Sequence, residues 1–122
     1  MKRIFLFLMV TGIAFGQIKS PYALVDAKMD KIPDNLSTST NGIAGYINEN
    51  FKSENDKARA VFYWTASNIS YDIENIATIN FAEVSPDKIK NTLLARKGVC
   101  IHYAEVFNDI AQKVGLQSYI IY

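Results

Sequence analysis

A run of apolar residues between Gly98 and Gly115 constrains the fold more than any other part of the sequence. Its apolar side chains recur at helical spacing, which predicts a helix over residues 100–114 that ends at Gly115. One continuous face carries Cys100, Ala104, Phe107, Ala111 and Val114, and Ile101, Val106 and Ile110 lie elsewhere on the same helix. A helix that is apolar over so much of its girth is usually central, so we expect the other elements to pack around it.

Residues 17–52 are expected to form a lead-in segment before the main part of the domain. Prolines and a Ser/Thr run make most of it irregular, with one short helix that starts near Asn41 and ends before Phe51. The segment also contains apolar residues that could pack onto the domain, so we do not expect a free tail.

Capping signals mark two further helices. Ser53 is a typical N-terminal cap, and the helix that follows it is expected to end at Tyr71. Ser85 followed by Pro86 gives a second helix start, with the serine as the expected cap. A β-branched and aromatic run over residues 118–122 predicts a strand.

The first sixteen residues have the pattern of a secretory signal peptide. Two basic residues precede an apolar run over residues 4–14, and Ala14 and Gly16 fit the positions that a signal peptidase reads. The run is shorter than the ~20 residues that a membrane-spanning helix needs. We therefore expect cleavage before Gln17 and export to the periplasm or the extracellular space, with no stable membrane insertion afterwards.

Composition excludes several classes of protein. The hydrophobic share of 49% and the net charge of +1 do not fit a disordered chain, and they give no electrostatic footprint for nucleic acid. One cysteine and one histidine are too few for a disulfide framework or a structural zinc site. The acidic residues lack the spacing of a calcium loop. We therefore expect no metal and no cofactor.

Cys100 is the candidate functional residue. A lone cysteine on the apolar face of a helix is usually an inert packing residue. Cys100 nevertheless falls in the first turn of its predicted helix, where unpaired backbone N–H groups stabilise a thiolate or a neighbouring oxyanion. Gly98 permits a tight turn just before it. Both interpretations remain open on these residues alone.

Two segments in the right order resemble the transglutaminase-like superfamily. Residues 91–122 are similar to its nucleophile segment, and residues 56–72 are similar to its preceding helix. The matching residues are Gly98, Cys100, Tyr103, Ala104 and Gly115-Leu116 in the first segment, and Trp64 and Asn68-Ile69-Ser70-Tyr71-Asp72 in the second. The resemblance is strongest to bacterial relatives of the cytokinesis-type transglutaminase/protease-like proteins.

The resemblance implies an α+β fold with a papain-like/transglutaminase-like core. Residues 53–122 would form the N-terminal part of that domain, mainly its helical half with the first strand of an antiparallel sheet. It implies that Cys100 is the nucleophile that attacks a glutamine carboxamide or a peptide carbonyl of a protein or peptide substrate. It also implies a histidine base and an orienting aspartate on strands after this helix.

The single histidine, His102, is not expected to be that base. Two residues along a helix turn its side chain about 200° away from that of Cys100. We therefore expect a truncated front portion of a longer domain, inactive as given because the histidine and aspartate partners are missing.

Two other functions remain open on the sequence. The chain could be a non-catalytic peptide- or cell-wall-binding module of the same fold. Alternatively, Cys100 could form a disulfide with another chain in an oxidising compartment.

Overall fold

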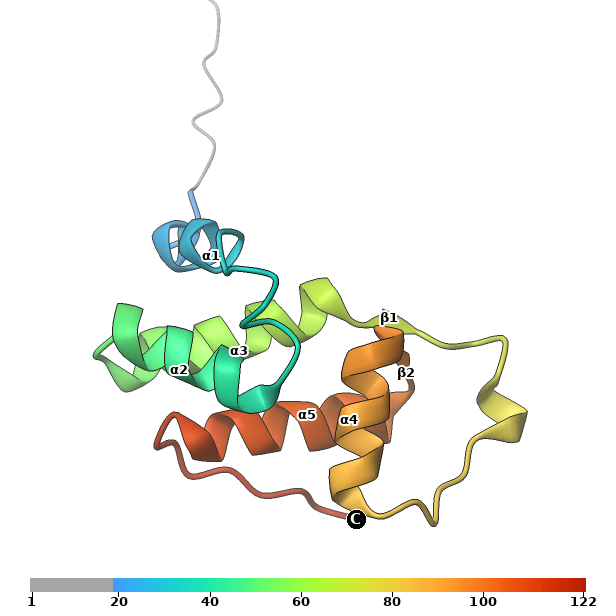
Figure 1. Cartoon of the computed structure of the whole chain (residues 1–122). Coiled ribbons are helices and arrows are strands. Elements are labelled where there is room, and N and C mark those ends of the chain that lie inside the picture. Colours follow the sequence, from blue (N-terminus) through green and yellow to red (C-terminus); the bar gives the residue numbers. More distant parts are fainter. Residues whose placement is uncertain (1–18) are drawn as a thin grey trace, which may run out of the picture.

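The computed structural model describes residues 19–122, shown in Figure 1. The expected signal peptide, residues 1–16, and its cleavage site before Gln17 lie outside the described residues. In chain order the elements are α1 (Ala23–Met29), α2 (Thr40–Asn50), α3 (Glu54–Asn68), β1 (Ser70–Tyr71), the 3₁₀ turn η1 (Ile76–Thr78), α4 (Ser85–Ala95), β2 (Lys97–Gly98) and α5 (Cys100–Lys113). None of the described helices is long and apolar enough to cross a membrane.

Helix α5 is central, as predicted from the apolar residues around most of its circumference. It packs against α2 and α3, and α4 crosses it close to its N-terminal end (Figure 1). Three of its side chains, Val106, Ile110 and Ala111, are buried in the shared core, as is its C-cap residue Val114. Most of the core therefore forms where α2, α3 and α5 meet.

Two of the predicted helix ends are confirmed by their hydrogen bonds. The Ser53 hydroxyl accepts a hydrogen bond of 3.1 Å from the N–H of Asp56 and caps α3. At the end of α5, Gly115 has a φ of 92°, which suits glycine because it has no Cβ. The N–H of Leu116 then donates to the carbonyl of Ala111 at 2.9 Å, which satisfies a terminal carbonyl of the helix.

The capping role predicted for Ser85 is wrong. The N-cap of α4 is Val84, and Ser85 is the first residue of the helix. The Ser85 hydroxyl instead donates a hydrogen bond to the carboxylate of Glu105 on α5. The Ser85 hydroxyl therefore bonds a residue that is distant in sequence, whereas the local pattern predicted a hydrogen bond to the helix backbone.

The prediction of an antiparallel sheet that begins at residues 118–122 is also wrong. The described residues contain one small sheet, in which β1 and β2 run parallel with Ser70 opposite Lys97 and Tyr71 opposite Gly98. Residues 118–122 are not a strand, because a strand requires a backbone partner and no described segment pairs with them. The described fold is therefore mostly helical.

The lead-in segment packs onto the domain. Trp64 of α3 is 0% exposed, and its indole N–H donates to the hydroxyl of Ser37 at 3.2 Å. The Arg96 guanidinium lies 5.0 Å from the centre of the Trp64 ring and donates to the Ser37 carbonyl at 2.8 Å. Val25 and Met29 of α1 are buried in the same core. The tertiary contacts of Trp64 thus satisfy the N–H of a buried indole.

Candidate functional site

Cys100 is the first residue of α5, and its side chain is exposed. The chain reaches it through β2, where the Gly98 carbonyl accepts a 3.0 Å hydrogen bond from the N–H of Asp72. The two strands therefore fix the turn from which the helix starts. Because the thiol is exposed, it does not pack in the core as an inert cysteine would.

Two backbone N–H groups at this helix terminus have no partner among the described residues. The carbonyl of Val99 accepts from the N–H groups of His102 and Tyr103, at 2.9 and 3.2 Å. The N–H groups of Cys100 and Ile101 make no hydrogen bond within residues 19–122. Such unpaired donors, together with the helix dipole, favour negative charge next to them.

The predicted apolar face of α5 is divided by the structure into a buried and an open part. Ala111 is buried, whereas Ala104 and Phe107 are only half-buried and Cys100 is exposed. Val106 and Ile110, which the sequence pattern placed off the main face, are the most deeply buried side chains of the helix. The half of the face that is nearest Cys100 is therefore open.

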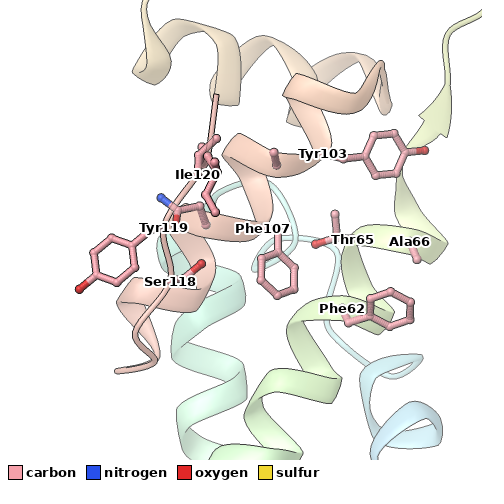
Figure 2. Close-up of a pocket in the computed structure, with 11 residues that line it drawn as sticks. Phe62, Thr65, Ala66, Tyr103, Phe107, Ser118, Tyr119 and Ile120 are labelled. Atoms are coloured by element: carbon pink, nitrogen blue, oxygen red, sulfur yellow. The ribbon is translucent and has the colours of Figure 1, made fainter.

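An apolar groove of about 540 Å³ lies along this open face (Figure 2). It begins one helical turn from Cys100, since Ala104 lines it. The segment that follows α5 crosses one side of it, and α3 forms the other (Figure 2). Its lining residues are Phe62, Thr65 and Ala66 from α3, Tyr103, Ala104, Phe107 and Asn108 from α5, and Ser118, Tyr119, Ile120 and Ile121 from the segment after α5.

Tyr103 ties the first turn of α5 to the end of α3. Its hydroxyl donates to the carbonyl of Ile69, and its ring lies 6.2 Å from that of Tyr71. Burial raises the pKa of Tyr103, so the hydroxyl remains a protonated donor at neutral pH. The match of Tyr103 to a family position therefore corresponds to a structural contact one turn from Cys100.

His102 contacts the backbone just before Cys100. Its Nδ1 accepts a hydrogen bond of 3.0 Å from the N–H of Val99, and the residue is half-buried. No hydrogen bond joins the imidazole to the Cys100 thiol within the described part of the chain. This contact has little local signal, because a valine followed by a histidine three residues later is not the usual capping pattern.

A buried ion pair joins α4 to the same part of α5. The Nζ of Lys88 lies 3.5 Å from Oε1 of Glu105, and both side chains are 7% exposed. Ser85 donates to the second oxygen of the same carboxylate. Sequence reasoning missed this cluster, because lysine and glutamate are ordinarily surface residues.

The described residues hold no group of three His, Cys, Asp or Glu side chains that could bind a metal ion.

The model of the transglutaminase-like superfamily matches residues 41–122, about two thirds of the chain. The chain therefore belongs to the transglutaminase-like superfamily, as the two sequence motifs indicate. The matched range contains Cys100, the groove and the buried ion pair. The helices and the small sheet are consistent with part of a transglutaminase-like fold. Among the curated proteins, and among the solved structures, the searches find no match.

Proposed function

We propose that this chain supplies the cysteine nucleophile of an exported protein of the thiol acyltransferase or cysteine-peptidase type. The observation that supports it is the exposed thiol of Cys100 at the first position of α5, beside two N–H groups without partners. Family membership supports the same proposal, because the matched range contains Cys100, the residue that the sequence resemblance assigns to the nucleophile.

The proposed reaction is an acyl transfer. The Cys100 thiolate attacks the carbonyl carbon of a glutamine carboxamide or a peptide bond, and the carbonyl electron pair moves onto oxygen. The N–H groups of Cys100 and Ile101 would stabilise that oxyanion. Its collapse forms a thioester and releases ammonia or an amine, which must gain a proton. An amine or water then attacks the thioester, and the thiol is restored.

Proton transfer is the step for which the chain is poorly equipped. His102 is its single histidine, and the Nδ1 atom of that residue is bonded to the backbone. General acid–base catalysis typically contributes about 10²–10⁴-fold. We therefore propose that this chain alone cleaves amides slowly, and that a histidine and an aspartate in the family's positions would complete the site.

The groove supports a protein or peptide substrate. It is lined mainly by apolar side chains (Figure 2) and starts one turn from Cys100, so it could accept an apolar side chain of a peptide whose carbonyl lies at the thiol. The half-buried ring of Phe107 lies two turns along the same face from the thiol.

The test uses an acyl donor whose leaving group needs no proton. The full chain is incubated with p-nitrophenyl acetate, and intact-mass spectrometry follows the acetyl adduct. We expect acylation of Cys100 to be faster in the folded chain than in the urea-unfolded chain, which carries the same thiol without the helix terminus. Cys100→Ala should remove the adduct. Equal rates in the folded and unfolded chain would contradict the proposal.

A non-catalytic peptide- or cell-wall-binding module is the second candidate, and the open groove is the observation that favours it. In that case the folded chain would bind peptide or wall polymer, Phe107→Ala would weaken binding, and Cys100 would be no more reactive than a free thiol. Binding together with an unreactive thiol would favour the module over the acyltransferase.

A third proposal is a disulfide between Cys100 and another chain, because the thiol is exposed. Non-reducing gels of protein from the exported fraction test it. A monomer band alone would remove it.

Export itself rests on the signal-peptide pattern of residues 1–16. N-terminal sequencing of the protein from a bacterial host is expected to begin at Gln17. Leu8→Arg, which interrupts the apolar run, should keep the full-length chain in the cytoplasm. An uncleaved N-terminus in the unaltered protein would contradict the proposal.

A further inference from the structure

The N-terminus of α5 has only one of the two hydrogen bonds of a capping box. In a full capping box, the N-cap side chain bonds the N–H of residue N3, and the N3 side chain bonds the N–H of the N-cap. Here the N-cap is Val99, whose side chain cannot accept a hydrogen bond. Only the second half is present, in which Nδ1 of His102 accepts from the N–H of Val99 at 3.0 Å.

Gly98 makes room for this arrangement. A Cβ placed on Gly98 would lie 2.5 Å from the Cβ of His102 and 2.9 Å from its Cγ. Any larger residue would therefore displace the imidazole from the peptide that it contacts. The turn before Cys100 is held on one side by the N–H of Asp72, just after β1, which donates to the Gly98 carbonyl, and on the other by His102, which accepts the N–H of Val99.

We propose that His102 is a positioning residue for Cys100, with a neutral imidazole that holds the Val99 N–H and a protonated imidazole that releases it. The inference rests on the proposed function, in which Cys100 is the nucleophile. By fixing Val99, His102 keeps the first turn of α5 in the conformation that leaves the N–H groups of Cys100 and Ile101 without intramolecular partners.

The protonation state matters because an imidazolium has no lone pair to accept the Val99 N–H. Burial, and next the positive charge of Lys88, lower the pKa of His102 below 6.5, so the acceptor form predominates at neutral pH. Nearby carboxylates oppose this shift without reversing it. The charged groups that face the imidazole are Lys88 of α4, Glu83 before α4, Asp72 after β1 and Glu105 of α5. Lys97 of β2 also faces it, because Lys97 and His102 line one small cavity.

Two variants separate the hydrogen bond from the titration. His102→Gln keeps an acceptor that can reach the N-cap but has no proton to gain, whereas His102→Ala removes the acceptor. The first readout is hydrogen exchange of the Val99 amide, expressed as protection relative to its intrinsic rate. We expect protection in the unaltered chain to fall as the pH drops through the lowered pKa of His102, to persist in His102→Gln, and to be absent in His102→Ala at every pH.

The second readout is the rate at which iodoacetamide alkylates Cys100. At neutral pH, His102→Ala should be slower by about 2- to 10-fold, the range that corresponds to one lost hydrogen bond. His102→Gln should stay close to the unaltered chain there and become relatively faster once the pH falls through the lowered pKa of His102. Glu49→Gln is the control, because it removes an exposed titratable group of α2 far along the chain from this turn.

The outcomes distinguish this inference from the proposed function. Equal Val99 protection in the unaltered chain and both variants would overturn the positioning role, whatever the acylation assay shows. Loss of protection in His102→Ala with rescue by His102→Gln would support it even if no acyl transfer occurs. If His102→Ala does not fold, the pH dependence of the unaltered chain against His102→Gln still decides, since a parallel pH dependence overturns the role.

Discussion

Gly98 and His102 depend on each other. The glycine provides the space in which the imidazole lies against the backbone, and the imidazole accepts the N–H of the residue after the glycine. The sequence resemblance marks Gly98 as a turn residue, which explains only part of its role. The close approach of a side chain is the further reason why glycine is required at this position.

A methyl group at Gly98 is therefore expected to be costly. Gly98→Ala places a Cβ 2.5 Å from that of His102, and the overpacking should destabilise the fold by about 1–3 kcal/mol in urea unfolding. Gly45→Ala is the matched control. Nothing lies within 4 Å of a Cβ at Gly45, which is inside α2, so that change should stabilise by about 0.5–1 kcal/mol. Equal effects of the two variants would rule out the steric explanation.

The lowered pKa of His102 also predicts how stability depends on pH. Because folding lowers that pKa, the unfolded chain takes up the proton first as the pH falls through 6.5. The contribution of His102 is therefore fully present above pH 6.5 and declines below it, down to the pKa of the folded state. Unfolding free energies at pH 7.5 and at lower pH should show a smaller loss for His102→Gln than for the unaltered chain. Identical losses would contradict the assigned shift.

Helix positions could be predicted from the sequence better than tertiary pairing. Ser53 and Gly115 were identified correctly because a cap and a left-handed terminal residue depend on a few neighbouring backbone groups. The strand expected at residues 118–122 was wrong, since its β-branched and aromatic composition does not supply a partner. The partner of Ser85 could not be predicted either, because Glu105 is distant in sequence and close only after α4 crosses α5.

The candidate site could also be predicted only in part, because local pattern places a residue on an element but does not show which distant segments surround it. The position of Cys100 at a helix start follows from local pattern, and the structure places it there. The groove could not be foreseen, because it depends on how far α3 and the segment after α5 leave Phe107 uncovered. Apolar periodicity indicates which residues share a face but not how much of that face is covered.

The ion pair between α4 and α5 predicts a strong asymmetry between two carboxylates on α5. Glu105→Gln leaves Lys88 buried without its counterion, and this should cost roughly 3–5 kcal/mol in urea unfolding. Asp109→Asn breaks the pair with Lys113. Because the Asp109 side chain is 30% exposed and that of Lys113 is 36% exposed, this change should cost less than about 1 kcal/mol. Similar costs for both variants would show that the Lys88 charge is solvated despite its burial.

The family match and the packed core cover different residue ranges. The match begins at residue 41, yet the core extends further toward the N-terminus and includes Val25 and Met29 of α1. A bidentate pair between Asp26 and Arg59, with hydrogen bonds of 2.6 and 2.7 Å, fixes α1 to α3. The lead-in is therefore part of the packed domain and not an appendage to the family segment.

Removing the lead-in should destabilise the domain although the family segment is untouched. A chain that starts at Ser39 retains the cap of α2 but loses the buried side chains of Val25 and Met29, whose burial is worth about 3–6 kcal/mol together. It also loses Ser37 and leaves the indole N–H of Trp64 without its partner.

Trp64 provides the measurement, because it is the single tryptophan and is fully buried. In the chain that starts at Ser39, its fluorescence should shift to longer wavelength and its urea midpoint should fall. A chain that starts at Lys19 keeps every described residue and is the control, with emission and midpoint expected to match those of the full chain. An unchanged midpoint in the shorter chain would mean that α1 and Ser37 do not fold cooperatively with the rest, and that α2 to α5 are stable without them.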